Sequence, residues 1–84
     1  MERSINVSGN GKSLVIDVDG QGSASFDPSQ DIKAEELFNV LTYSKGDKYA
    51  VVRGDRGDVS EGAFVSFCML LEEIAEGISK LDTE

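Results

Sequence analysis

The strongest hydrophobic periodicity in the chain is helical and lies near its C-terminal end. Between Ser60 and Leu81, six apolar residues recur at alternating spacings of three and four. Such spacing aligns side chains along one side of an α-helix, and the charged residues of the segment fall off this line. We therefore predict a long amphipathic helix whose apolar stripe packs on the rest of the protein. The stripe consists of Phe64, Phe67, Leu71, Ile74, Ile78 and Leu81.

The first half of this helix is more apolar than a single stripe requires. Cys68 and three further apolar residues lie off the stripe. A helix that is apolar nearly all round needs cover on more than one side. A sheet and a second helix can supply that cover, and core packing is then the whole explanation. Any apolar surface left over would form an interface, with a second copy of the chain or with a partner protein, through Val65, Met69 and Leu70.

The first 26 residues follow a different period. Ile5 and Val7 alternate with polar neighbours, Leu14, Ile16 and Val18 alternate with Val15 and Asp17, and an Asn-Gly pair lies between these runs. Alternation is typical of strands with one buried face, and Asn-Gly favours a tight hairpin turn. A shorter strand is predicted over 23–26, where small residues weaken the signal. Together these residues predict an antiparallel meander.

The middle of the chain predicts one more helix and one more strand. Asp27 can cap a helix with Pro28 at its first position, and Asp31 is an alternative cap one turn later. The predicted helix covers 32–43, where apolar residues recur at helical spacing. The short apolar run within 48–53 predicts a strand, buried on both faces if it is central in the sheet. The helical positions are Ala34, Leu37, Phe38 and Leu41.

A turn separates this strand from the final helix and completes the predicted architecture. Asp58 is the expected cap of that helix, with Glu61 as its capping-box partner, and Ser60 is the alternative cap. The element order is β-β-(β)-α-β-α. We predict a single α+β domain over 1–84, in which an antiparallel sheet of three to four strands carries two helices packed on one face.

Acidic residues outnumber basic ones by enough to limit the choice of partners. The net charge is −8. Seven acidic residues and one basic residue lie between Asp58 and Glu84, against nine acidic and seven basic residues in the preceding part. Direct binding to nucleic acid or to an anionic membrane is therefore not expected, because binding to phosphates needs lysine and arginine. A protein with a basic surface is the expected partner.

The sequence also predicts a location for the protein. No apolar run is long enough to span a bilayer, and the first residues do not resemble a secretory signal. The single cysteine, Cys68, cannot form an internal disulfide. We therefore expect a cytoplasmic protein, in a compartment that keeps thiols reduced.

Three short motifs suggest a ligand but fit turns better. Gly11-Lys12-Ser13 matches the end of a phosphate-binding P-loop, but Asn6 stands where the first glycine should be, and a strand pattern follows. Residues 17–22 match the start of a calcium loop, but its twelfth position is Pro28 instead of glutamate. Arg-Gly-Asp occurs twice within 53–58, and integrin binding would need an extracellular protein. We predict turns at all three places, and neither a metal nor a cofactor.

The sequence contains few residues in patterns suited to catalysis. The chain contains no histidine, the commonest general base and metal ligand. Cys68 stands among apolar residues, where a thiol packs more often than it reacts. Glu72 and Glu73 point about 100° apart on a helix, and Glu72 and Glu76 share a face but are expected to be solvated. We expect no enzymatic activity.

These observations favour a small acidic binding protein that inhibits or modulates a partner by occupying its basic, nucleic-acid-binding surface. Anti-defence proteins of phages and mobile elements act in this way as nucleic-acid mimics, which is an analogy only. The carboxylates would pair with the lysines and arginines that normally hold phosphates. The alternative is a structural subunit that forms a homodimer or a larger assembly through its final helix, its charge serving solubility. The residues predicted to bind the partner are Asp58, Glu61, Glu72, Glu73, Glu76, Asp82 and Glu84.

Overall fold

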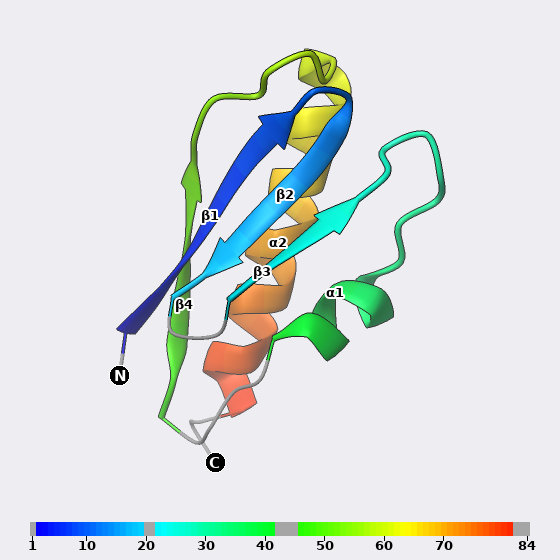
Figure 1. The fold of residues 1–84 in the computed structure, drawn as a ribbon. Helices are drawn as coiled ribbons and strands as arrows, with labels where there is room; N and C mark the ends of the chain where they lie inside the picture. Colours follow the sequence, from blue (N-terminus) through cyan, green and yellow to red (C-terminus); the bar gives the residue numbers. More distant parts are fainter. Residues whose placement is uncertain (1, 20–21, 42–45, 82–84) are drawn as a thin grey trace.

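In the part of the chain that the structure describes, four strands and two helices follow one another in the predicted order. The computed structural model describes residues 2–19, 22–41 and 46–81 (Figure 1). The α+β class is confirmed, and the short third strand pairs into the sheet. The elements are β1 (Glu2–Asn10), β2 (Ser13–Val18), β3 (Gly22–Phe26), α1 (Ala34–Val40), β4 (Lys48–Arg53) and α2 (Glu61–Leu81).

The prediction of an antiparallel sheet is wrong in one pairing. The strands lie in the order β3-β2-β1-β4. Neighbours in the meander run antiparallel, but β4 runs parallel to β1, with Ile5 opposite Val51. Between β3 and β4 the chain crosses one face of the sheet through α1 and re-enters beyond β1, in the direction of β1 (Figure 1). Alternation of apolar residues reveals a strand but not its direction.

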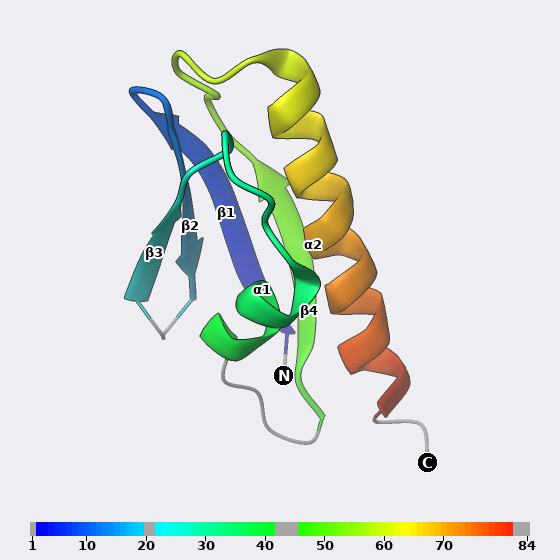
Figure 2. The same ribbon diagram turned by 90° about the vertical axis from the view of Figure 1, so that its right-hand side faces the viewer.

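β4 is an edge strand and is covered on one face. Tyr49 is buried and Val51 is half-buried on the side that faces the helices. Ala50 and Val52 point the other way and are exposed, Val52 to 45%. Burial on both faces, expected for a central strand, does not occur because the helices lie on one face of the sheet only (Figure 2).

The first hairpin forms at the predicted Asn-Gly pair. Asn10 pairs with Ser13, so Gly11 and Lys12 make a two-residue turn. Gly11 has a φ of 63°, and no residue other than glycine has a positive φ in the part of the chain that the structure describes. A positive φ at the first central position alone is typical of a type II′ turn, which matches the twist of the two strands.

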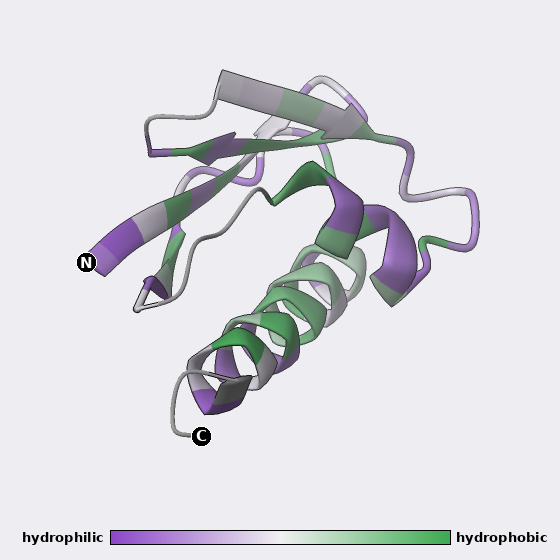
Figure 3. Ribbon diagram, turned by 90° about the horizontal axis from the view of Figure 1, so that it is seen from below, coloured by the Kyte–Doolittle hydropathy of each residue, from purple (hydrophilic) through white to green (hydrophobic). Residues whose placement is uncertain are grey.

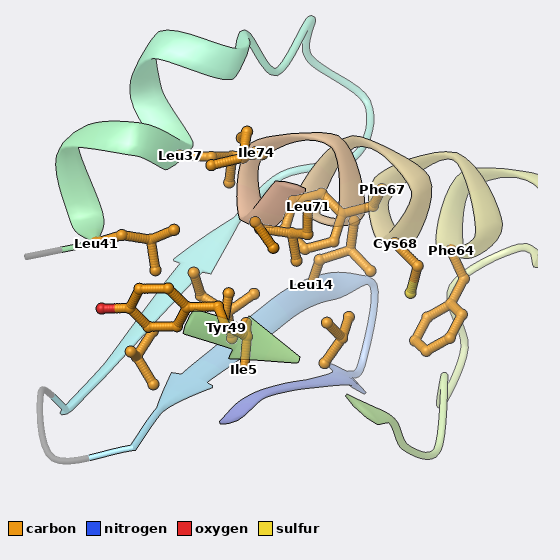
Figure 4. Close-up of a cluster of buried hydrophobic side chains, with 14 of the residues drawn as sticks. Ile5, Leu14, Leu37, Leu41, Tyr49, Phe64, Phe67, Cys68, Leu71 and Ile74 are labelled. Atoms are coloured by element: carbon orange, nitrogen blue, oxygen red, sulfur yellow. The ribbon is translucent and has the colours of Figure 1, made fainter. Parts of the chain in front are cut away.

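The core lies between the sheet and the two helices. Alternate residues of β1 and β2 point toward the helices, and the stripe of α2 packs onto them from Phe64 to Ile78 (Figure 4). In Figure 3 the hydrophobic residues of α2 lie toward the sheet and α1. Cys68 is fully buried as well, so this off-stripe residue belongs to the core. The buried set includes Ile5, Val7, Leu14, Ile16, Val18, Leu37, Leu41, Phe64, Phe67, Leu71, Ile74 and Ile78.

α1 begins later than either predicted cap. The carboxylate of Asp27 accepts hydrogen bonds from the N–H of Ser29 (2.9 Å) and from its hydroxyl (2.7 Å). These bonds close a local turn that competes with helix formation. They also lower the pKa of Asp27 from its usual value of 3.8, the hydroxyl bond having the larger effect. The helix starts at Ala34, where the N–H of Lys33 donates to the carboxylate of Glu36 at 3.3 Å.

The cap of α2 is Ser60, the alternative in the prediction, and not Asp58. The hydroxyl oxygen of Ser60 accepts a hydrogen bond from the N–H of Ala63 at 3.3 Å. Asp58 lies earlier and its N–H donates to the carbonyl of Gly11 at 3.1 Å. Asp58 therefore connects the segment before α2 to the first hairpin turn. The helix is capped two residues later, by Ser60.

Residues 54–58, which we call the bridging loop, are tied to β1 through the backbone. The N–H of Gly9 donates to Asp55 O and the N–H of Gly54 donates to Val7 O, both at 2.7 Å. The loop runs so close to Gly9 that a Cβ there would lie within 3.0 Å of the carbonyl carbon and oxygen of Arg56. The Arg-Gly-Asp repeat thus forms the predicted turn between β4 and α2.

Candidate protein-binding site

The described carboxylates predicted to bind a partner are all exposed. Glu61, Glu72, Glu73 and Glu76 lie on α2, and Asp58 lies in the bridging loop. Asp82 and Glu84 lie outside the described residues. Because α2 is one continuous helix, its regular turn of about 100° per residue fixes which of these side chains share a face.

One side of α2 carries the four glutamates together with two apolar residues. Glu61, Glu72, Glu73 and Glu76 fall within about one third of the helix circumference and span roughly 22 Å along its axis. Val65 and Met69 fall in the same sector, between Glu61 and the other three. We call these six residues the acidic face. It lies on the side of α2 opposite to the stripe, and all six residues except the half-buried Val65 are exposed.

The three residues predicted to form an interface do not lie on one side of α2. Met69 is 56% exposed in the middle of the acidic face, and Val65 beside it is half-buried. Leu70 is half-buried on the other flank of α2, about 100° from Met69. Val65 and Leu70 are about 140° apart on the helix, so one flat contact cannot take both.

Two of the glutamates have cations beside them. A terminal nitrogen of Arg53, on β4, lies 3.4 Å from Glu72 Oε1, and Lys80 Nζ lies 3.4 Å from Glu76 Oε1. All four side chains are about half exposed or more, so each pair contributes only about 0–1 kcal/mol and can be exchanged for another cation. Glu61 and Glu73 form no ion pair among the residues that the structure describes.

A hollow on the other flank of α2 was not predicted from the sequence. It holds about 180 Å³ between α2 and residues 28–32, and we call it the α2 cleft. Its lining includes Ile32 and Pro28, in a segment whose composition suggests a helix start but which forms a turn followed by irregular loop in the structure. The remaining lining residues are Leu14, Gln30, Ala63, Ser66, Phe67 and Leu70.

The motifs that suggested ligands fall in turns or strands. Gly11-Lys12-Ser13 forms the hairpin turn and the start of β2, as predicted. Lys12 lines a shallow hollow with two carboxylates, those of Asp27 and Asp58. Asp17 lies within β2, and residues 20–21 of the calcium-like motif lie outside the described residues. Within 2–19, 22–41 and 46–81, no three acidic or thiol side chains are grouped as a metal site.

Two groups that could do chemistry are held in the core. Burial raises the pKa of the Cys68 thiol from its usual 9.0, so the thiolate is disfavoured at neutral pH. Burial likewise raises the pKa of the Tyr49 hydroxyl from its usual 10.0. Tyr49 lies near an ion pair in which Arg3 Nε is 3.3 Å from the buried carboxylate of Asp47.

Similarity to known proteins does not indicate a function for this chain. Comparisons with protein-family models, with curated proteins and with solved structures found no match to this chain. Neither described helix is both long enough and apolar enough to cross a membrane.

Proposed function

We propose that this protein is a small non-catalytic binding module that occupies a basic surface of a partner protein through the acidic face of α2. The observation that carries the proposal is the position of Met69. This large apolar side chain is more than half exposed, and the exposed Glu72 and Glu73 lie one turn further along the same side of α2. An apolar centre with a charged rim is the usual arrangement of a protein–protein interface.

The chemistry of the acidic face defines the partner. Carboxylates form their strongest contacts with arginine and lysine, and a net charge of −8 draws a basic surface toward the protein. Basic surfaces of this kind commonly hold nucleic-acid phosphates. Occupying one would inhibit or modulate its nucleic-acid binding, as anti-defence proteins of phages and mobile elements do by analogy. The setting we propose is cytoplasmic, because the single cysteine, Cys68, is free and buried and the chain does not depend on a disulfide.

The acidic face also bears on the alternative of a helix-mediated homodimer. Exposed Met69 and half-buried Val65 favour some contact through this face. A symmetric pair of α2 helices would, however, place the glutamates of one copy against those of the other. Like charges facing each other across an interface cost several kcal/mol. A basic partner satisfies both the apolar centre and the rim, so we favour it over a second copy.

The proposal is tested on the partner itself. Affinity capture from the native cell at two salt concentrations identifies it, and the purified pair is then titrated. Glu73→Lys is expected to weaken binding by about tenfold or more, and Met69→Ala to weaken it as well. The expected affinity falls steeply with salt, and the protein displaces nucleic acid from its partner.

The control variant is Asp17→Lys. Asp17 is exposed on the face of the sheet that the helices leave uncovered, and this change alters the net charge as much as Glu73→Lys does. It is expected to leave most of the affinity intact. Equal losses from both variants would show that only net charge matters and that the acidic face is not the site. A dimeric mass for the isolated protein that Met69→Glu makes monomeric would favour the homodimer.

A further inference from the structure

We infer that the α2 cleft takes an apolar anchor side chain from a basic segment of the partner. This inference rests on the proposed function and extends it to a second, chemically distinct contact. The cleft lies next to the acidic face, since Ser66 and Leu70 line both the cleft and a hollow that contains Met69 and Glu73. One partner segment can therefore reach both.

The interior of the cleft is apolar and has the size of one side chain. Leu14 and Phe67 are buried and form its floor, and Ile32, Ala63 and Leu70 are half-buried in its walls. The ring of Phe67 packs against the tilted ring of Phe26, with the ring centres 5.6 Å apart. An apolar cavity of roughly 150 Å³ holds a benzene molecule. The cleft, at about 180 Å³, can accept a phenylalanine, leucine or methionine side chain.

The surroundings of the cleft are acidic. Through shared lining residues it adjoins one hollow with Asp31 and Glu36, one with Asp27 and Asp58, and one with Glu73. Lys12 is the basic residue among those that line these hollows. A site with an apolar floor and carboxylates on several sides favours an apolar side chain flanked by lysine or arginine. The same surroundings repel an acidic segment, which includes a second copy of α2.

The contact is tested with a defined probe, a seven-residue peptide in which three lysines flank a central phenylalanine on each side. Its matched partner has serine at the centre and the same charge. Each peptide is titrated into isotope-labelled protein, and amide chemical shifts are followed by NMR. The phenylalanine peptide is expected to shift the amides of Ile32, Ala63, Ser66 and Leu70, and to bind roughly tenfold more tightly than the serine peptide.

Two variants of one exposed residue test the position of the anchor. Ser66→Phe fills the cleft from its rim and is expected to remove the preference for the phenylalanine peptide. Ser66→Ala keeps the cleft open and is expected to retain it. Because Ser66 is exposed on α2, neither change removes a core contact, and thermal unfolding checks that both variants fold.

The outcomes separate the cleft from the acidic face. Equal affinity for the two peptides, shifts confined to the amides of Glu61 and of Glu72–Glu76, or no shifts at millimolar peptide would each overturn the inference. Shifts confined to those glutamates would leave the proposed function standing. Cleft shifts that Ser66→Phe abolishes would support the inference, even if Glu73→Lys had no effect on the partner and the acidic face were abandoned.

Discussion

Replacing Gly9 with alanine is expected to destabilise the fold by about 2 kcal/mol, through the backbone alone. The new Cβ would lie within 3.0 Å of the carbonyl carbon and oxygen of Arg56. Real Cβ atoms do not approach other atoms so closely, and a backbone carbonyl cannot rotate away as a side chain can. The bridging loop must therefore separate from β1. That movement breaks or weakens the hydrogen bonds Gly9 N–H to Asp55 O and Gly54 N–H to Val7 O.

The magnitude follows from those two hydrogen bonds. Each contributes about 0.5–1.5 kcal/mol net, and any group left buried without a partner costs about 1–3 kcal/mol. Alanine also restricts the unfolded chain, which offsets about 0.4–1 kcal/mol of the loss. Losing both bonds costs about 1–3 kcal/mol, and the penalty for a group left unpaired roughly cancels the offset from the unfolded chain, so a net loss of about 2 kcal/mol is expected. Gly9 itself does not have a positive φ, so the effect comes from lack of space and not from a forbidden conformation.

Urea unfolding followed by circular dichroism measures this change, with Gly77→Ala as the control. Gly77 is an exposed residue within α2, and a Cβ there meets no atom within 4 Å. Alanine is expected to raise stability at that position by about 0.5–1 kcal/mol, because glycine is a poor helix former. A Gly9→Ala protein as stable as the unaltered chain would refute the close contact between β1 and the bridging loop.

Three further predictions concern the core and a helix cap. Arg3→Met removes the ion pair with the buried Asp47 carboxylate and is expected to cost about 1–3 kcal/mol in urea unfolding; an unchanged midpoint would contradict a stabilising role for the pair. Burial raises the folded-state pKa of Cys68 above 9.0 and that of Tyr49 above 10.0. The contribution of each neutral side chain to the free energy of unfolding is therefore fully present below these pH values, and it is lost as the pH rises through the raised pKa. Unfolding free energy should therefore fall above pH 9.0, and a Cys68→Ala variant that shows the same decline from that pH would argue against the thiol as a cause. Ser60→Ala removes the α2 cap and is expected to cost about 1 kcal/mol, measured as a lower melting temperature, whereas Asp58→Ala should cost less if serine is the cap.

The sequence predicts the elements of this fold better than their arrangement. Alternation places β1 and β2, and helical spacing places α2, because these patterns reflect one buried side of each element. The direction of β4 is not encoded in its own residues. It depends on how the chain crosses the sheet, and the pairing of Ile5 with Val51 joins distant parts of the chain. Local patterns carry no information on such a crossover.

The candidate site shows the same division. The glutamates of α2 are predictable as exposed, because they lie off its apolar stripe. The separation of Val65 from Leu70, and the complete burial of Cys68, depend on which neighbours flank the helix. The α2 cleft was missed because Asp27 and Pro28 are as typical of a turn as of a helix start. The hydrogen bonds from Ser29 to Asp27 stabilise the turn in place of a helix start.

The position of β1 in the sheet has a consequence for biosynthesis. Of the four described strands, β1 is translated before the other three, yet it pairs with β4 on one side and with β2 on the other. The meander can pair as soon as it leaves the ribosome, but its apolar face stays uncovered until α2, which follows all the other described elements, has been made. Nascent chains that end before α2 would therefore expose Ile5, Ile16 and their neighbours, and are expected to need chaperones or to aggregate. The core of this domain is therefore completed by α2, the same helix that we propose meets the partner.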